Sequence, residues 1–90
     1  MRSFYRVIAI KSGEAWVVEE EIVETLVPLK NGQIKIFNWK SHLQKSEQWY
    51  DFVERSIKEA LNLLNQWNLE KSVRSDLAGK IWYHFELTEE

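Results

Sequence analysis

The sequence predicts an α+β fold in which an antiparallel sheet of about four strands carries one long amphipathic helix on one face. Three patterns support this fold class. Apolar and polar residues alternate over residues 81–88, an Asn-Gly pair separates two extended stretches, and residues 46–67 repeat apolar positions at helical spacing. The predicted order is three strands, one helix and one strand. Since 90 residues leave room for one core, we expect a single domain over residues 1–90.

The first two strands are predicted on either side of a short polar turn. Residues 4–10 are rich in aromatic and β-branched side chains, which favours a strand. Residues 11–14 then predict a turn, since Gly13 can adopt a positive φ. The second extended stretch covers residues 15–27. Three consecutive glutamates at 19–21 interrupt it and indicate a bulge, a bend or a break into two shorter strands.

The Asn31-Gly32 pair is the strongest local signal in the sequence. It is typical of a type I′ turn, which needs a positive φ at both central residues. We therefore expect a hairpin that joins residues 22–29 to residues 33–39. Pro28 has no N–H to donate, so its position is expected at an edge or at a gap in the strand pairing.

The helix is predicted over residues 46–67. Its apolar arc covers about half of the circumference. The arc consists of Trp49, Tyr50, Phe52, Val53, Ser56, Ile57, Ala60, Leu61, Leu63, Leu64 and Trp67. Ser46 or Ser41 is the expected N-cap. A polar connection over residues 70–79 follows, with one helical turn expected at 75–78.

The last strand is predicted from strict alternation. Ile81, Tyr83, Phe85 and Leu87 form the apolar set, and we expect them to face the core. Trp82 and His84 alternate with this set, so their side chains should point to the opposite face of the sheet.

Composition excludes several classes of protein. There are no cysteines, which rules out disulfides and thiolate metal sites. The formal charge is −2, whereas non-specific nucleic-acid binders are usually basic. No apolar run is long enough to span a membrane, and we expect a cytoplasmic protein with no membrane contact. Five tryptophans stand out, because tryptophan is enriched in small cores and at binding hot spots.

No catalytic grouping is present in the sequence. The two histidines, His42 and His84, lie in separate predicted elements and lack metal-ligand spacing. His84 and Glu86 share one side of a strand and form the best acid–base candidate, although such surface pairs usually carry no chemistry. We therefore expect a protein that is not an enzyme and that binds neither a metal nor a cofactor.

The predicted sheet carries large apolar side chains on both faces, and one helix covers only one of them. The uncovered face is the candidate partner-binding surface. Its predicted residues are Tyr5, Trp16, Phe37, Trp39, Trp82 and His84. The structural alternative is that a curved hairpin or the 70–79 connection folds over this face.

Two functions follow from this surface. The first is a small protein-interaction module, such as an adaptor, accessory subunit or inhibitor, which binds a partner protein. A homodimer through the open face is a variant of this hypothesis. The second is single-stranded nucleic-acid binding, with bases stacked on the aromatic rings and Lys35, Lys40 and Lys80 on the phosphates. The negative net charge of the chain disfavours this second function, because nucleic-acid phosphates are also negative.

Overall fold

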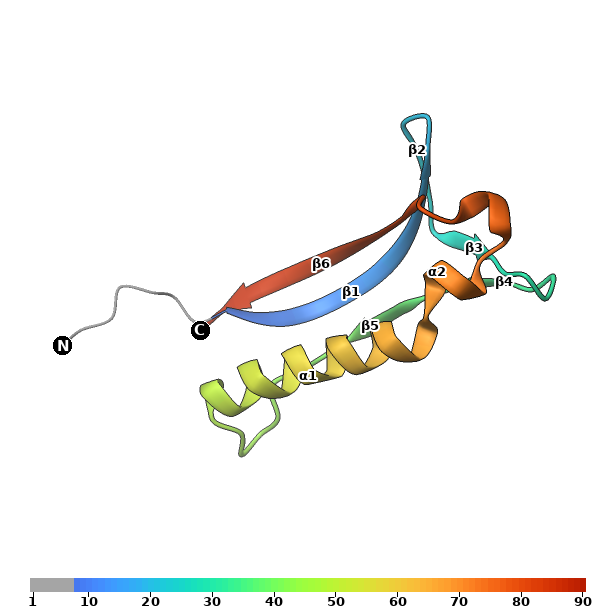
Figure 1. The fold of residues 1–90 in the computed structure, drawn as a ribbon. Helices are drawn as coiled ribbons and strands as arrows, with labels where there is room; N and C mark the ends of the chain where they lie inside the picture. Colours follow the sequence, from blue (N-terminus) through green and yellow to red (C-terminus); the bar gives the residue numbers. More distant parts are fainter. Residues whose placement is uncertain (1–7) are drawn as a thin grey trace.

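The computed structural model describes residues 8–90 and confirms the α+β class (Figure 1). Within this part of the chain, six strands form one four-stranded and one two-stranded antiparallel sheet, and the long helix packs beside the larger sheet. The elements in chain order are β1 Ile8–Glu19, β2 Ile22–Glu24, β3 Leu26–Pro28, β4 Ile34–Ile36, β5 Asn38–Lys40, α1 Trp49–Trp67, α2 Leu69–Ser72, η1 Ser75–Leu77 and β6 Ile81–Glu89.

β1 is the central strand of the larger sheet. β6 pairs with one edge of β1 from end to end, while β5 and β2 share the other edge. The turn predicted over residues 11–14 is wrong, because β1 runs straight through this segment. A β-bulge between Ile10 and Ser12 absorbs the extra residue. Gly13 lies inside the strand, where the ring of Trp39 occupies the space that a side chain would fill.

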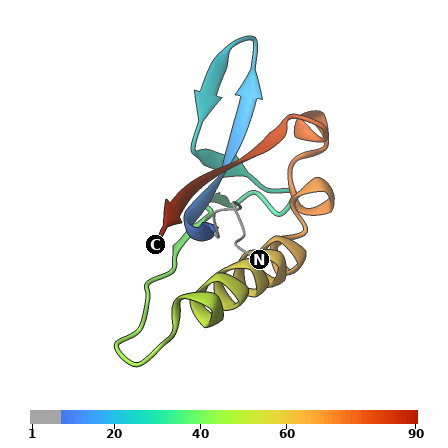
Figure 2. The ribbon, with the colours of Figure 1, turned by 90° about the vertical axis from the view of Figure 1, so that its left-hand side faces the viewer.

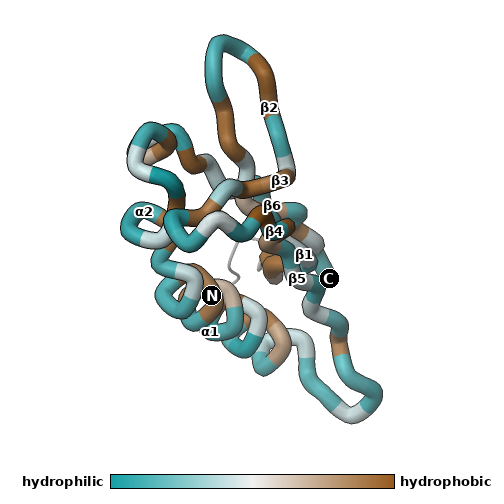
Figure 3. Tube along the Cα trace, turned by 90° about the vertical axis from the view of Figure 1, so that its right-hand side faces the viewer, coloured by the Kyte–Doolittle hydropathy of each residue, from teal (hydrophilic) through white to brown (hydrophobic). Residues whose placement is uncertain are grey.

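The three glutamates form a hairpin turn between β1 and β2. Glu20 and Glu21 have φ values of 46° and 70°, and Glu19 pairs with Ile22. Of the predicted alternatives, the break into two strands is therefore the one found. The resulting hairpin projects from the body of the domain, and both of its arms carry apolar stretches (Figures 2 and 3).

The Asn-Gly pair also forms a hairpin, but with a different turn from the one predicted. The Leu29 N–H donates to the Gln33 carbonyl at 2.8 Å, so the loop contains three residues. Only Gly32 among these has a positive φ, of 89°. A three-residue loop that ends in a left-handed glycine is the common alternative to the type I′ turn. The hairpin itself, β3 with β4, is confirmed.

Helix α1 begins at Trp49, three residues later than predicted. Gln48 occupies the N-cap position without a side-chain bond, so neither predicted serine caps the helix. The Ser41 hydroxyl instead donates to Glu59. The helix ends at Asn68, which adopts a left-handed φ of 45°. The helical turn expected after residue 74 is present as η1.

A charge cluster holds the segment before the helix against α1. The Arg55 guanidinium donates to Glu47 at 2.7 Å, to Glu59 at 2.8 Å and to the His42 carbonyl at 2.6 Å. The hydrogen bond from Arg55 lowers the pKa of Glu47 below its ordinary value. The pKa of Glu59 is also lowered, chiefly by the hydrogen bond from Ser41 and then by the hydrogen bond from Arg55.

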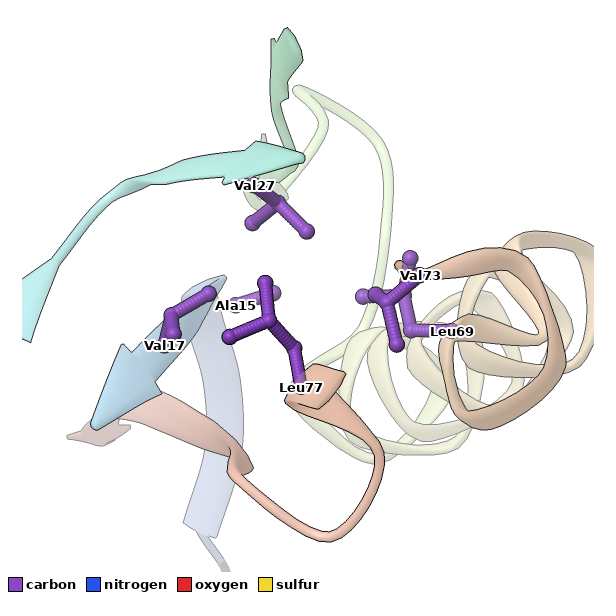
Figure 4. Close-up of a cluster of buried hydrophobic side chains, with 6 residues drawn as sticks. All are labelled: Ala15, Val17, Val27, Leu69, Val73 and Leu77. Carbon is purple, nitrogen blue, oxygen red and sulfur yellow. The ribbon is translucent and has the colours of Figure 1, made fainter. Parts of the chain in front are cut away.

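The core lies between the larger sheet and the helical segments (Figure 4). Its main cluster consists of Ala15, Val17, Val27, Leu69, Val73 and Leu77. A second cluster forms where Ala9 of β1 meets Phe52 and Val53 of α1. We call the side of the larger sheet that faces these clusters the inner face, and the opposite side the open face.

Two parts of the predicted core are wrong. Leu87 is 60% exposed, because it pairs with Ile10 beside the bulge, beyond the main cluster. On α1, Tyr50, Ile57 and Leu61 are also exposed. The helix packs chiefly against the single strand β1, which covers a narrower arc than a wide sheet would. No helix within residues 8–90 is long and apolar enough to cross a membrane.

Candidate functional site: the open face of the sheet

Side-chain alternation defines the open face. Ala15, Val17, Ile81 and Tyr83 contribute to the core, so their neighbours along β1 and β6 project from the other side of the sheet. As predicted from the sequence, Trp82 and His84 alternate with the core residues of β6. Trp16 alternates with those of β1 and pairs directly with Trp82.

The aromatic part of the open face is ordered by two contacts. The rings of Trp16 and His84 stack with centroids 4.6 Å apart and an interplanar angle of 9°. The Trp16 indole N–H donates to the Glu14 carboxylate at 2.8 Å. Trp82 lies beside this stack and is 62% exposed. Two rings are thus held in place, and a third, large ring is presented to solvent.

A shallow hollow of about 280 Å³ adjoins the stacked rings. Its polar walls come from three adjacent strands: Ser12 and Glu14 of β1, Asn38 and Lys40 of β5, and His84 and Glu86 of β6. The strand register explains this grouping. Ser12 pairs with both Lys40 and Glu86, and Glu14 pairs with both Asn38 and His84, which produces two polar rows across the sheet. The sequence pattern of β6 indicated only the edge residues of this hollow, His84 and Glu86.

The hollow offers hydrogen-bonding groups but no assembled acid–base machinery. Within the described residues 8–90, no hydrogen bond joins His84 to Glu14, Glu86 or Ser12, and Glu14 is already bonded to Trp16. The same part of the chain contains no cluster of three or more histidine and carboxylate side chains that could hold a metal ion.

Phe37 and Trp39 do not belong to the open face, which corrects the sequence-based prediction. The Phe37 ring packs edge-on against Trp67 at 5.2 Å, and Trp39 packs against both Trp67 and Phe85, at 5.6 and 5.8 Å. Both side chains lie on the inner face, because β5 places Trp39 opposite Gly13, where the missing side chain leaves room for an indole. Tyr5 lies outside the described residues.

The connection after α1 leaves the open face uncovered. Leu69, Val73 and Leu77 of this connection are buried in the main core cluster, on the inner side. The structural alternative in which this segment folds over the aromatic residues is therefore wrong. The β1–β2 hairpin extends past the first residue of β6 instead of curling over the open face (Figure 2).

Two smaller apolar surfaces were not expected from the sequence. Leu26, Ile34 and Ile36 are 51–61% exposed on the outer side of the β3–β4 hairpin, whose other side buries Val27. On α1, Tyr50, Ile57 and Leu61 form an exposed stripe.

Comparisons with known proteins add no functional assignment to this geometry. No protein-family model, no curated protein and no solved structure matches the chain.

Proposed function

We propose that this protein is a small, non-catalytic interaction module that binds a partner protein through the open face. The observation that carries the proposal is the exposure of Trp82 beside the fixed Trp16–His84 stack. Tryptophan is the residue type most typical of binding hot spots, and rigid neighbours reduce the entropy lost on association. An adaptor, an accessory subunit and an inhibitor all use such a surface.

The charges around the aromatic residues favour a protein partner over a nucleic acid. Glu14 and Glu86 line the hollow together with a single cation, Lys40. Lys80, another predicted phosphate contact, is paired with Glu19 at 2.9 Å. Lys35 lies on β4, in the separate two-stranded sheet. Stacked bases would therefore bring their phosphates towards carboxylates, which weakens binding.

A complementary partner surface can be described from these groups. An apolar or aromatic side chain would cover Trp82, and a lysine or arginine side chain would enter the hollow between Glu14 and Glu86. The guanidinium group is the better fit of the two, since its planar donors can stack on Trp16 or His84 while they bond a carboxylate.

The test is affinity capture from native extract with matched tryptophan and tyrosine variants. Trp82→Ala should abolish recovery of a stoichiometric protein partner. Tyr50→Ala removes an aromatic ring of similar exposure, 68%, from α1 and should leave recovery unchanged. Circular dichroism should show that both variants remain folded. Equal recovery by both variants would contradict the proposal, and loss of the partner on nuclease treatment would favour nucleic-acid binding.

A further inference from the structure

The outer edge of β6 has no strand partner within residues 8–90. Among the described residues β6 pairs with β1 along one edge, over nine residues that include no proline. Natural proteins usually protect such an edge, because it is a template for another strand. Here its residues alternate between apolar side chains and the aromatic and charged groups of the open face.

The hydrogen-bond pattern identifies which backbone groups point outward. The Val18 N–H donates to the Lys80 carbonyl at 2.9 Å, so even-numbered residues of β6 bond to β1. The Ala15 N–H donates to the Phe37 carbonyl on the other side of β1, in agreement with this alternation. The N–H and carbonyl groups of Ile81, Tyr83 and Phe85 therefore face the unpaired edge.

We propose that a second copy of this chain occupies this edge, with the two β6 strands antiparallel and Tyr83 opposite Tyr83 on the two-fold axis. Lys80 of each copy then lies opposite Glu86 of the other, Trp82 opposite His84, and Ile81 opposite Phe85. Over residues 80–86 each opposed pair in this register joins opposite charges, apolar side chains or rings. About six backbone hydrogen bonds form across the axis.

The neighbouring register is less complementary. If His84 were opposite His84, Trp82 would face Glu86, and Lys80 would face Thr88, so that both opposite-charge pairs would be lost. Trp82 opposite His84 also brings together two ring types that already stack within the sheet, where His84 stacks on its diagonal neighbour Trp16. Lys80 can keep its bond to Glu19, because an ammonium group has three donors.

The dimer extends the sheet across the two-fold axis and places both open faces on the same side. The pair would thus present two Trp82 side chains to one partner surface. Self-association does not require that any other protein bind there, so the dimer and the proposed function can fail independently.

The test exploits the two charge pairs. We expect light scattering on the full chain to give twice the 10.8 kDa monomer mass at high concentration, with dissociation on dilution. The contact between residues 80 and 86 occurs twice in the symmetric dimer. Glu86→Lys places a lysine opposite a lysine at both contacts, and Lys80→Glu places a glutamate opposite a glutamate. Each variant should therefore raise the dimer dissociation constant by about tenfold or more. Lys58→Glu, on the exposed side of α1, is the charge-matched control and should have no effect.

Mixing the two single variants identifies the register. The Lys80→Glu chain has glutamate at both positions 80 and 86, and the Glu86→Lys chain has lysine at both. Each contact between the two chains therefore joins a glutamate to a lysine, and their mixture should form a heterodimer as stable as the wild-type dimer. A wild-type monomer at all concentrations overturns the proposal. A dimer whose dissociation constant is unchanged in the Lys80 and Glu86 variants also overturns it, and would indicate that another surface, such as the β3–β4 hairpin, forms the interface.

Discussion

Trp39 and Trp82 lie on opposite faces of one sheet and are used in opposite ways. Trp39 contacts Trp67 and Phe85 edge-on, at 5.6 and 5.8 Å, and its indole N–H is buried without a hydrogen-bond partner. Packing alone holds this ring in place. Trp82, in contrast, is 62% exposed, and its neighbour Trp16 has its N–H bonded to Glu14.

The difference between the two faces comes from the residues across the strands. Trp39 lies opposite Gly13, which leaves an indole-sized space on the inner face. Trp82 lies opposite Trp16 on the open face, which the helical segments leave uncovered, so its ring remains exposed. Residue type therefore does not decide whether a tryptophan is buried or exposed; the face on which it lies and its cross-strand neighbour do.

The largest contrast is expected between Trp39→Ala and Trp82→Ala. The first should lower the free energy of unfolding by about 3–5 kcal/mol, as for other buried aromatic residues, and a domain of this size has little stability to spare. The second should change it by about 0.5 kcal/mol or less. Urea titration followed by circular dichroism measures both. Equal losses would mean that Trp82 also belongs to the core.

A smaller loss is expected from Gly13→Ala. The added methyl group would overlap the six-membered ring of Trp39, which cannot move away because Trp67 and Phe85 enclose it. We expect a cost of about 1–3 kcal/mol. The double variant Gly13→Ala/Trp39→Phe, compared with each single variant, should show a favourable coupling, since the smaller ring relieves the overlap. Strict additivity would show that the two residues do not compete for the same space.

Local patterns predicted the elements well where one rule governed them. The alternation over residues 81–88 identified β6 and placed Trp82 and His84 on the correct face, and the helical spacing identified α1. The Asn-Gly pair identified a hairpin, although the turn type depends on backbone angles that neighbouring residues shift.

Predictions failed where contacts distant in sequence override local preference. Gly13 favours a turn when considered alone, but pairing with both β5 and β6 keeps it in a strand. Phe37 and Trp39 were assigned to the open face because the strand that pairs beside them could not be known. The hollow could not be predicted for the same reason: Ser12 lies beside Lys40 only because of the register in which β1 pairs with β5, and the local sequence does not contain this register.

The charge cluster on the helix side should make stability depend on acid. The pKa values of Glu47 and Glu59 lie below their ordinary value of 4.5, so their contribution is present above that pH and is lost as the pH falls through the lowered values. Arg55→Ala should destabilise the domain near neutral pH, less than the packing variants do, since these side chains are partly exposed. The difference in the free energy of unfolding between the wild type and Arg55→Ala should become smaller in acid, where the two glutamates are protonated. A difference that stays constant with pH would show that Arg55 acts through packing.

A small effect on the free energy of unfolding is expected from His84→Ala on the open face. Removing one partner of a cross-strand stack costs about 0.5–1 kcal/mol, because the Trp16 ring keeps its bond to Glu14. Urea titration measures the cost, near-ultraviolet circular dichroism reports the order of the tryptophans, and Glu54→Ala on the exposed side of α1 is the control. If the proposed function holds, capture of a partner protein should fall more than stability does, because the stack holds the rings beside Trp82 in place. A cost of about 3 kcal/mol, similar to that of Trp39→Ala, would mean that the open face stabilises the fold, and the exposure of Trp82 would then need another explanation.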